Sequence, residues 1–344
     1  MTVRSVWIIE PHQIEIRSAP VPEPERNQVR VRTSVSGISS GTELLAYRGL
    51  LPGHSGDDAI DPHAGVAEYP MRTGYCSVGV IDSIGPGVAE RWIHQRVFTF
   101  QPHQDCAVVS PDSCIAIPDQ ISDQLATFIP NLETAVGLVM DAAPVIGERV
   151  VVLGQGIVGL LVTRLLSRFP LALLAAADNL PRRRDWARRS GADLVIDPAA
   201  PDQRAHLEDD LAVGGVSGAD LVLELSGNPD ALNDAISLSG YGGRIVAGSW
   251  YGTKPAAIDL GGRFHRNRIS LVSSQVSTID PRQTGRWTKD RRMEQVLRLL
   301  RELDLDDLIS HRFPLEQAAD AFTLLDTRPD EALQVVLTCD DEIR

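Results

Sequence analysis

Short runs in which apolar and polar residues alternate dominate the first third of the chain. The runs at 5–10 (SVWIIE), 28–38 (QVRVRTSVSGI) and 76–85 (CSVGVIDSIG) are rich in β-branched residues, and Pro, Gly and Asp separate them from their neighbours. A turn sequence, GPGV, follows at 85–88. This pattern predicts a compact, barrel-like β domain.

The periodicity changes to that of helices near residue 122. Residues 122–143 repeat apolar positions at helical spacing, and Ser122 or Asp123 can cap the start of that helix. Beyond Gly147, strands alternate with helices, which predicts a parallel sheet covered by helices on both faces. The expected strands are 149–154, 171–178, 194–197, 221–227, 243–249 and 269–274, and the expected helices start near 156 and span 181–191 and 229–239. An amphipathic helix at 291–303 and a final strand at 332–338 are expected to end the chain.

The composition is that of a folded protein with two domains. Of the 344 residues, 43% are hydrophobic and 23% are charged, which is enough apolar material for large cores. The excess of 46 acidic over 33 basic residues gives a net charge of −13, which opposes binding to nucleic acid or to an anionic membrane. A small-molecule partner is therefore favoured. The longest apolar run, 150–166, contains Gln155 and Arg164, so it predicts a buried strand and helix and no membrane span.

Cysteine usage favours a reducing compartment. The four cysteines form no C-x-x-C pair and are too few for a disulfide scaffold. The residues that follow Met1 lack the apolar core of a signal peptide. We therefore expect a cytoplasmic protein with free thiols.

A glycine motif follows the strand expected at 149–154 and opens the next helix. It reads Gly154-Gln155-Gly156-Ile157-Val158-Gly159. The first glycine permits a tight turn, the second lets the backbone approach a pyrophosphate, and the third lets the helix pack closely on the strand. The N–H groups and the dipole at the start of the helix then attract the anion. The motif predicts a dinucleotide-binding doubly wound sheet of the Rossmann type.

Asp178 indicates which dinucleotide is bound. It ends the next expected strand, where a carboxylate accepts hydrogen bonds from the ribose 2′-hydroxyl and repels a 2′-phosphate. This favours NAD. Arg182, Arg183 and Arg184 follow closely and could neutralise a phosphate, which leaves NADP as the less favoured cofactor. Asn179 and Arg183 are expected to border the cofactor as well.

Further motifs extend along almost the whole chain. They are GISSGTE (37–43), GVIDSIGPGV (79–88), ETAVGLV (133–139), ELSGN (224–228), GGRIVAGSWYG (242–252) and LISHRFPLEQAADAF (308–322). In order and spacing they resemble the medium-chain dehydrogenase/reductase superfamily, the relatives of zinc alcohol dehydrogenase. Residues 37–49 and 264–276 also resemble the subgroup that contains 2-desacetyl-2-hydroxyethyl bacteriochlorophyllide dehydrogenase, without assigning that pigment as the substrate.

The resemblance implies a fold, a domain division and an assembly. The expected fold class is α/β, with a Rossmann doubly wound parallel sheet and a GroES-like β-barrel domain. The GroES-like catalytic domain would comprise residues 1–133 together with 277–344, and residues 134–276 would form the dinucleotide-binding domain. The active site would lie in a cleft between the two, and a homodimer would form through edge strands of the Rossmann domains.

The sequence departs from this family where zinc-dependent members hold their catalytic metal. Ser39 or Ser40 replaces the first cysteine ligand, Gly74-Tyr75-Cys76 replaces the Gly-His-Glu that carries the second, and Pro130 or its neighbours occupy the third position. The lobe with four structural cysteines is missing as well. Because hydroxyls bind Zn²⁺ poorly, no metal is expected. A replacement site made of Cys76, His103 and Cys106 is the alternative, which no family spacing supports.

Without zinc, hydrogen-bond donors must polarise the carbonyl and supply the proton. Tyr75 and His103 are the preferred proton donors among the residues that the match places in the cleft, which are Ser39, Ser40, Thr42, Glu43, Tyr75, Cys76 and His103. Tyr75 could instead serve only barrel packing, His103 could bond only to backbone, and Glu43 could pair with Arg48. His54 and His63 lie on a Gly/Pro/Asp-rich loop, which is expected to be solvated.

The resemblance also assigns residues to the cofactor outside the glycine motif. Thr134 matches a threonine that approaches the nicotinamide ring. The others lie in loops at the carboxyl ends of strands, where doubly wound sheets bind ligands. They are Ser226, Gly227, Gly248, Ser249, Trp250, Ser274 and Gln275.

The sequence therefore predicts a zinc-independent, NAD(H)-linked oxidoreductase that interconverts a secondary alcohol and a carbonyl on a small molecule. One alternative is an NADPH-dependent enoyl or quinone reductase, against which Asp178 argues. An alternative of another class is a nucleotide-binding protein that has lost catalysis, which the missing metal ligands would allow. The substrate and the direction of the reaction cannot be read from the sequence.

Overall fold

The computed structural model describes residues 2–52, 68–213 and 215–339, so His54 and His63 lie outside the described residues. The chain forms two compact units. The first comprises Met1–Pro130 and Gln295–Arg344, and the second comprises Asn131–Glu294. Residues 277–294, which the sequence assigns to the catalytic domain, thus belong to the second unit. The domain boundaries given above remain a prediction.

The second unit contains a six-stranded sheet in the order β11-β10-β9-β14-β15-β16, in which every pair is parallel. Its strands are β9 (Arg149–Leu153), β10 (Leu173–Ala177), β11 (Leu194–Ile196), β14 (Ala219–Glu224), β15 (Ser239–Ala247) and β16 (Ser270–Ser273). Numbered by sequence, this is the order 3-2-1-4-5-6 of the dinucleotide-binding doubly wound sheet. The prediction of a parallel sheet is confirmed, and β12 (Ala212–Val213) and β13 (Val216–Ser217) add a short antiparallel pair.

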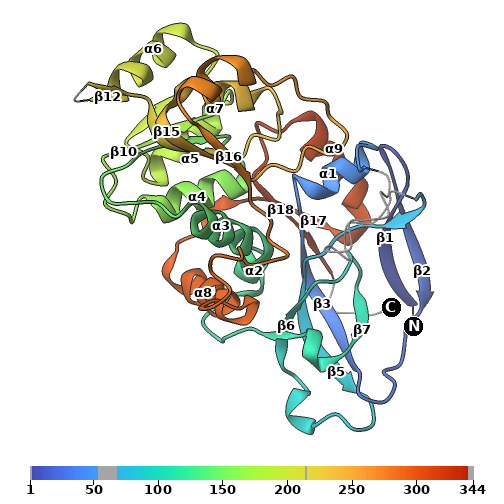
Figure 1. The fold of residues 1–344 in the computed structure, drawn as a ribbon. Helices are drawn as coiled ribbons and strands as arrows, with labels where there is room; N and C mark the ends of the chain where they lie inside the picture. Colours follow the sequence, from blue (N-terminus) through green and yellow to red (C-terminus); the bar gives the residue numbers. More distant parts are fainter. Residues whose placement is uncertain (1, 53–67, 214, 340–344) are drawn as a thin grey trace. The chain divides into compact units, whose positions relative to one another are not determined.

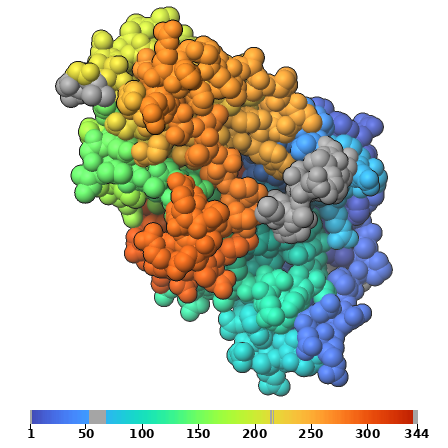
Figure 2. Space-filling view, in the orientation of Figure 1, coloured from blue at the N-terminus to red at the C-terminus, as the bar shows by residue number. Residues whose placement is uncertain are grey.

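Helices cover both faces of this sheet. Val150, Val151 and Val152 are all fully buried although successive strand residues point to opposite faces. In Figure 1, α6 and α7 lie on one side of the sheet and α4 lies on the other. The helices of the second unit are α3 (Ile129–Ala142, starting two residues earlier), α4 (Ile157–Leu166), α5 (Pro181–Arg189), α6 (Pro201–Asp210), α7 (Ala231–Leu238) and the π-helical turn η3 (Leu260–Phe264). The segment from 250 to 290, orange in Figure 2, reaches the surface, and Trp250 and Leu260 are 42% and 52% exposed.

A buried ion pair holds the segment that follows β16. Arg292 donates from Nη2 to Glu133 Oε1 over 2.7 Å, and only 2% of its side chain is exposed. It also donates to the carbonyl oxygens of Val276 and Thr278. Because one guanidinium satisfies the Glu133 carboxylate and two carbonyls, residues 276–278 are fixed to α3, the helix that carries Thr134.

The first unit contains two mainly antiparallel sheets. One has the order β2-β1-β4, and the other has the order β17-β18-β3-β5-β6-β8, with β7 paired to β3. The strands are β1 (Thr2–Glu10), β2 (Gln13–Pro20), β3 (Val29–Ile38), β4 (Met71–Arg72), β5 (Ser77–Ile84), β6 (Arg96–Thr99), β7 (Cys106–Val109), β8 (Ile115–Ala116), β17 (Ile309–Pro314) and β18 (Gln334–Thr338). The end of the chain therefore completes a sheet begun by its first third.

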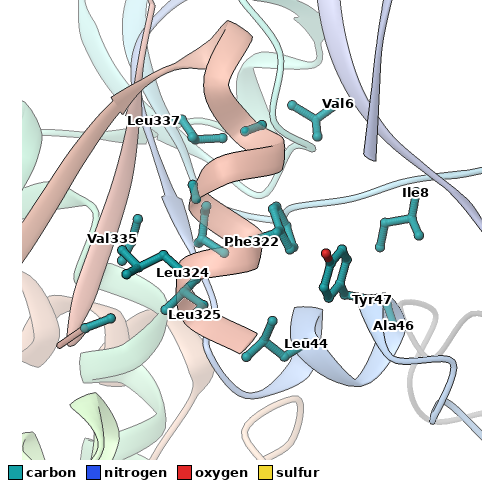
Figure 3. Close-up of a cluster of buried hydrophobic side chains, with 14 of the residues drawn as sticks. Val6, Ile8, Leu44, Ala46, Tyr47, Phe322, Leu324, Leu325, Val335 and Leu337 are labelled. Atoms are coloured by element: carbon teal, nitrogen blue, oxygen red, sulfur yellow. The ribbon is translucent and has the colours of Figure 1, made fainter. Parts of the chain in front are cut away.

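Two helices close the core of the first unit. Helix α1 (Thr42–Tyr47) follows β3 directly, and α9 (Ala318–Thr327) packs on it. Figure 3 shows Tyr47 facing Phe322, and their ring centroids are 5.4 Å apart. The ring of His103 lies on the same phenylalanine at 6.2 Å. The apolar core thus supports both α1 and His103.

The expected helix at 122–143 is instead two helices. Helix α2 (Asp123–Ala126) is capped by Ser122, whose hydroxyl accepts from Leu125 N as predicted. Helix α3 then starts at Ile129, because Pro130 lacks an N–H and fits only the first turn of a helix. Helix α8 (Lys289–Glu302) forms near its expected position. Short turns of 3-10 helix are η1 (Glu90–Trp92), η2 (Pro111–Ser113), η4 (Asp306–Leu308) and η5 (Leu315–Gln317). None of the helices in the described ranges is both long and apolar enough to cross a membrane.

Replacing Phe322 with alanine should destabilise the first unit by about 3–5 kcal/mol, because its fully buried ring supports both Tyr47 and His103. Chemical denaturation followed by circular dichroism measures this free energy of unfolding. Phe100→Ala is the matched control, since Phe100 is 38% exposed and should cost less than about 1 kcal/mol. Equal losses in both variants would contradict this account of the core.

Candidate functional site

Two glycines of the motif at 154–159 have no room for a side chain. Gly154 has φ +91°, and a Cβ there would lie 2.5 Å from Ser226 Cα. A Cβ on Gly159 would lie 2.0 Å from the carbonyl oxygen of Gly154. The first glycine therefore permits the turn, and the third permits the close packing of α4 on β9.

The start of α4 presents backbone donors with no side-chain cap. Gly156 is the N-cap residue and places no side-chain acceptor over the first N–H groups. The amide side chain of Gln155 is fully buried, where it donates to Val152 O and accepts from Thr163 Oγ1. Ile157 is buried too, and Val158 is partly exposed. Gln155 and Ile157 can therefore serve an anion only through their backbone N–H groups.

Asp178 joins the glycine loop to the loop after β10. Its Oδ2 accepts from Gln155 N at 2.7 Å, and its Oδ1 accepts from Leu180 N at 2.8 Å. The guanidinium of Arg183 lies 3.9 Å from Oδ2, while Asn179 is exposed. The structure thus places a carboxylate and a cation together where the ribose of a dinucleotide binds in such sheets.

Apart from Thr134, which lies in α3, the other predicted cofactor residues lie beyond the carboxyl ends of neighbouring strands. Gly227 donates from its N–H to Ser249 Oγ at 2.9 Å, which links the loops after β14 and β15. A Cβ on Gly248 would lie 2.5 Å from the Leu138 side chain. Ser274 donates to Asp141 at 2.6 Å, so its hydroxyl binds a protein carboxylate. Trp250 and Gln275 are exposed, and Thr134 is partly exposed.

In the first unit, the predicted catalytic residues gather around Glu43. This carboxylate is 3% exposed. Its Oε1 accepts from Ser39 N at 2.8 Å, and its Oε2 accepts from Thr73 Oγ1 at 3.2 Å and contacts His103 Nε2 at 2.7 Å. The alternative in which Glu43 pairs with Arg48 is wrong, because Arg48 binds Asp326 instead.

Tyr75 belongs to the same cluster. Burial and the nearby charge of Glu43 raise the pKa of its hydroxyl, and hydrogen bonds with the side chains of Ser39 and Thr42 offset part of that rise. The hydroxyl therefore stays protonated at neutral pH and can donate a hydrogen bond. Ser40, which follows Ser39 in the chain, is partly exposed.

His103 is not placed as the sequence suggested. Its side chain is fully buried, and its Nδ1 contacts Ser36 Oγ at 2.5 Å while Nε2 contacts Glu43. A direct contact between this ring and a substrate does not fit such burial. The ring also fills the space beside Gly74, where a Cβ would lie 2.7 Å from His103 Cγ. His103 thus packs beneath the backbone that carries Tyr75.

The residues present do not fit a family-type zinc site. Serine and tyrosine stand where relatives hold cysteine and histidine, and both His103 nitrogens are engaged by protein groups. Cys76 donates to the carbonyl of Thr127, and burial raises its pKa to about 12. Within the described ranges, no three His, Cys, Asp or Glu side chains form a group that could hold a metal ion. The alternative grouping of Cys76, His103 and Cys106 is not found there.

Three polar residues that the structure brings to these sites have no role in the predictions from the sequence. Ser36 and Thr73 complete the contacts of His103 and Glu43, and Glu224 lies at the end of β14. Ser36 faces the core from a strand otherwise rich in valine, which is the one signal that could have identified it.

Comparisons with known proteins agree with this architecture. The family described as zinc-binding dehydrogenase matches residues 158–316. The D-guloside 3-dehydrogenase of Escherichia coli K12 is 24% identical over 91% of this chain and 93% of its own. The RspB alcohol dehydrogenase of E. coli CFT073, solved with NADH, has a TM-score of 0.78 at 22% identity and covers 98% of this chain and 99% of its own. A Sinorhizobium meliloti 1021 structure with NADP has a TM-score of 0.75 at 18% identity, with 98% and 99% covered.

The fold and these relatives define an oxidoreductase with a Rossmann domain and a GroES-like domain. The family match and these relatives support membership of the medium-chain dehydrogenase/reductase superfamily. The two solved structures contain NADH and NADP, respectively. The family match at 158–316 does not reach Ser39 or Tyr75, so it does not bear on zinc. The resemblance to the bacteriochlorophyllide dehydrogenase subgroup, the homodimer and the cytoplasmic location remain predictions.

Proposed function

We propose that this protein is a zinc-independent dehydrogenase that interconverts a secondary alcohol and a carbonyl, with NAD as the preferred cofactor. The observation that carries the proposal is the cluster of Ser39, Thr42 and Tyr75 around the buried carboxylate of Glu43. Within this cluster, Ser39 and Tyr75 stand at positions where zinc relatives hold metal ligands. The D-guloside 3-dehydrogenase relative supports a polar, hydroxyl-rich substrate.

The second unit would bind the cofactor, which carries the hydride when bound. The N–H groups at the start of α4 would hold the pyrophosphate, and Asp178 would accept from the adenosine ribose. In the reductive direction, the substrate carbon gains a hydride and its oxygen gains a proton. Tyr75 would donate the hydrogen bond, and then the proton, to that oxygen.

Glu43 and His103 would act on this chemistry through Tyr75 and Ser39. Because Glu43 fixes the Ser39 backbone and its charge disfavours tyrosinate, it keeps the Tyr75 hydroxyl oriented and protonated. His103 contacts the other oxygen of Glu43, and Ser36 contacts the far nitrogen of the His103 ring, so neither has to reach the substrate. They are positioning residues in this scheme.

Turnover should persist in metal-free buffer with a chelator. The protein is offered sugars, glycosides and simple secondary alcohols with NAD⁺ or NADP⁺, and the reduced nicotinamide is followed by its absorbance. Activity that survives EDTA in protein without bound zinc supports the proposal. Loss of activity that Zn²⁺ restores would contradict the metal-free mechanism. Reduction of enones or quinones alone, with NADPH, would favour the alternative reductase.

Tyr75→Phe should lower kcat by about 10²-fold or more and leave the Kd for NADH unchanged, because only the proton donor is lost. Since the Tyr75 pKa lies above its ordinary value of about 10, ionisation of this residue should not reduce carbonyl reduction below about pH 10. Tyr47→Phe is the matched control, because the Tyr47 hydroxyl donates to the backbone carbonyl of His12 and is not part of the Glu43 cluster. Full activity in Tyr75→Phe would exclude Tyr75 as the donor.

Asp178→Asn should shift cofactor choice toward NADP by about tenfold, since it removes the charge that repels a 2′-phosphate. The amide oxygen can accept from only one of the Gln155 and Leu180 N–H groups, so the Kd for each cofactor should rise while the ratio of the two reports the lost charge. Dissociation constants for NADH and NADPH, measured by fluorescence, give the ratio. Asp185→Asn removes the same charge from the adjacent helix, where it pairs with Arg188, and should leave the ratio unchanged. An unchanged ratio in Asp178→Asn would mean that Arg183 governs the choice.

A further inference from the structure

A fully buried carboxylate in the second unit has no part in the scheme above. Glu224 ends β14 and is 0% exposed. Its Oε1 accepts from Ser226 N at 2.7 Å and from the Ser226 hydroxyl, and its Oε2 accepts from the Tyr251 hydroxyl. These donors are neutral, so hydrogen bonds alone replace the water that the charge has lost.

Glu224 joins two loops that follow different strands. Ser226 lies in the loop after β14, and Tyr251 lies in the loop after β15. Ser249 strengthens this link, because its Oγ accepts from Gly227 N at 2.9 Å. Lys254 adds a further bond from Nζ to the carbonyl of Gly227 at 2.7 Å. Residues 226–227 are therefore held from the side of the β15 loop by several bonds.

The linked loops lie beside the glycine motif. Strands β9 and β14 are neighbours, and Leu225 N donates to Leu153 O at 2.8 Å. Ser226 Cα is 2.5 Å from the position that a Cβ on Gly154 would take. The strand order reverses between β9 and β14, and doubly wound sheets bind their ligands at that switch point.

We propose that Glu224 and Tyr251 are positioning residues for the nicotinamide cofactor, which hold the loops at 226–227 and 249–251 in their binding geometry before the cofactor arrives. A preformed loop saves the free energy that ordering it would cost on binding. Burial and the hydrogen bond to Glu224 also raise the pKa of Tyr251, so its hydroxyl remains a donor over the working pH range. The proposal rests on the cofactor part of the proposed function and is independent of its alcohol chemistry.

The test measures NADH binding to the full chain. Tyr251→Phe and Glu224→Gln should each raise the Kd for NADH by about tenfold, which is the loss of one hydrogen bond to a charged group. The double variant should bind no more weakly than the weaker single variant, because the two residues act as one unit. Tyr241→Phe, on a tyrosine of β15 that is 70% exposed, is the matched control and should bind as the wild type does.

A second readout separates positioning from general stability. With NADH absent, limited proteolysis should cut the 249–262 segment faster in Tyr251→Phe, and saturating NADH should restore protection. A lower Tm with unchanged Kd and unchanged cleavage would overturn the proposal. If Glu224→Gln does not fold, the partly exposed Tyr251 still provides the test. If the wild type binds neither NADH nor NADPH, the cofactor assignment itself fails. Equal binding of NADH by the wild type and the variants would instead overturn only the positioning role of Glu224 and Tyr251.

Discussion

The arrangement of the candidate catalytic residues depends on the buried carboxylate of Glu43. A charge removed from water is costly unless hydrogen bonds replace the lost hydration. Here an amide, a hydroxyl and an imidazole surround the carboxylate. Ser39, Thr73 and His103 come from three segments of the chain, so satisfying one charge fixes all three segments at once. Because Ser39 also contacts Tyr75, the orientation of the proposed proton donor follows from the same constraint.

Two carboxylates repeat this arrangement in the second unit. Asp178 binds the backbone N–H groups of Gln155 and Leu180, and Glu224 binds that of Ser226. Each fixes a loop at the carboxyl end of a parallel strand, where the backbone has no ladder partner to fix it. A carboxylate suits this task because bonds from an N–H to a charged acceptor are stronger than bonds between neutral groups. These buried carboxylates therefore fix the conformation of the loops, in addition to any role they have in recognising a charged ligand.

The fold was largely predictable because it depends on patterns that repeat along the chain. Alternating strands and helices and the glycine motif gave the parallel sheet, and the departures at Ser39 and Tyr75 could be read at their motif positions. Helix α6 was missed because its sequence, PDQRAHLEDD, is mostly polar and buries only Leu207. Ser36 was missed for a different reason. Its place in a valine-rich strand is visible in the sequence, but its partner His103 is 67 residues away and meets it only after β3 and the segment before β7 pair, so no local pattern marks that contact.

The proposed absence of zinc changes which proton transfer the site favours. A metal stabilises an alkoxide directly, whereas a hydroxyl does so only by hydrogen bonding or by giving up its proton. The charge of Glu43 makes tyrosinate harder to form at Tyr75, so this residue rarely becomes a base near neutral pH. An alkoxide formed by hydride transfer to a carbonyl is a stronger base than tyrosinate and can take the proton. The same carboxylate that orders the cluster therefore keeps Tyr75 in its protonated form, which is the form that carbonyl reduction uses. Because reduction consumes a proton, the equilibrium between carbonyl and alcohol moves toward oxidation as the pH rises, whichever residue carries that proton.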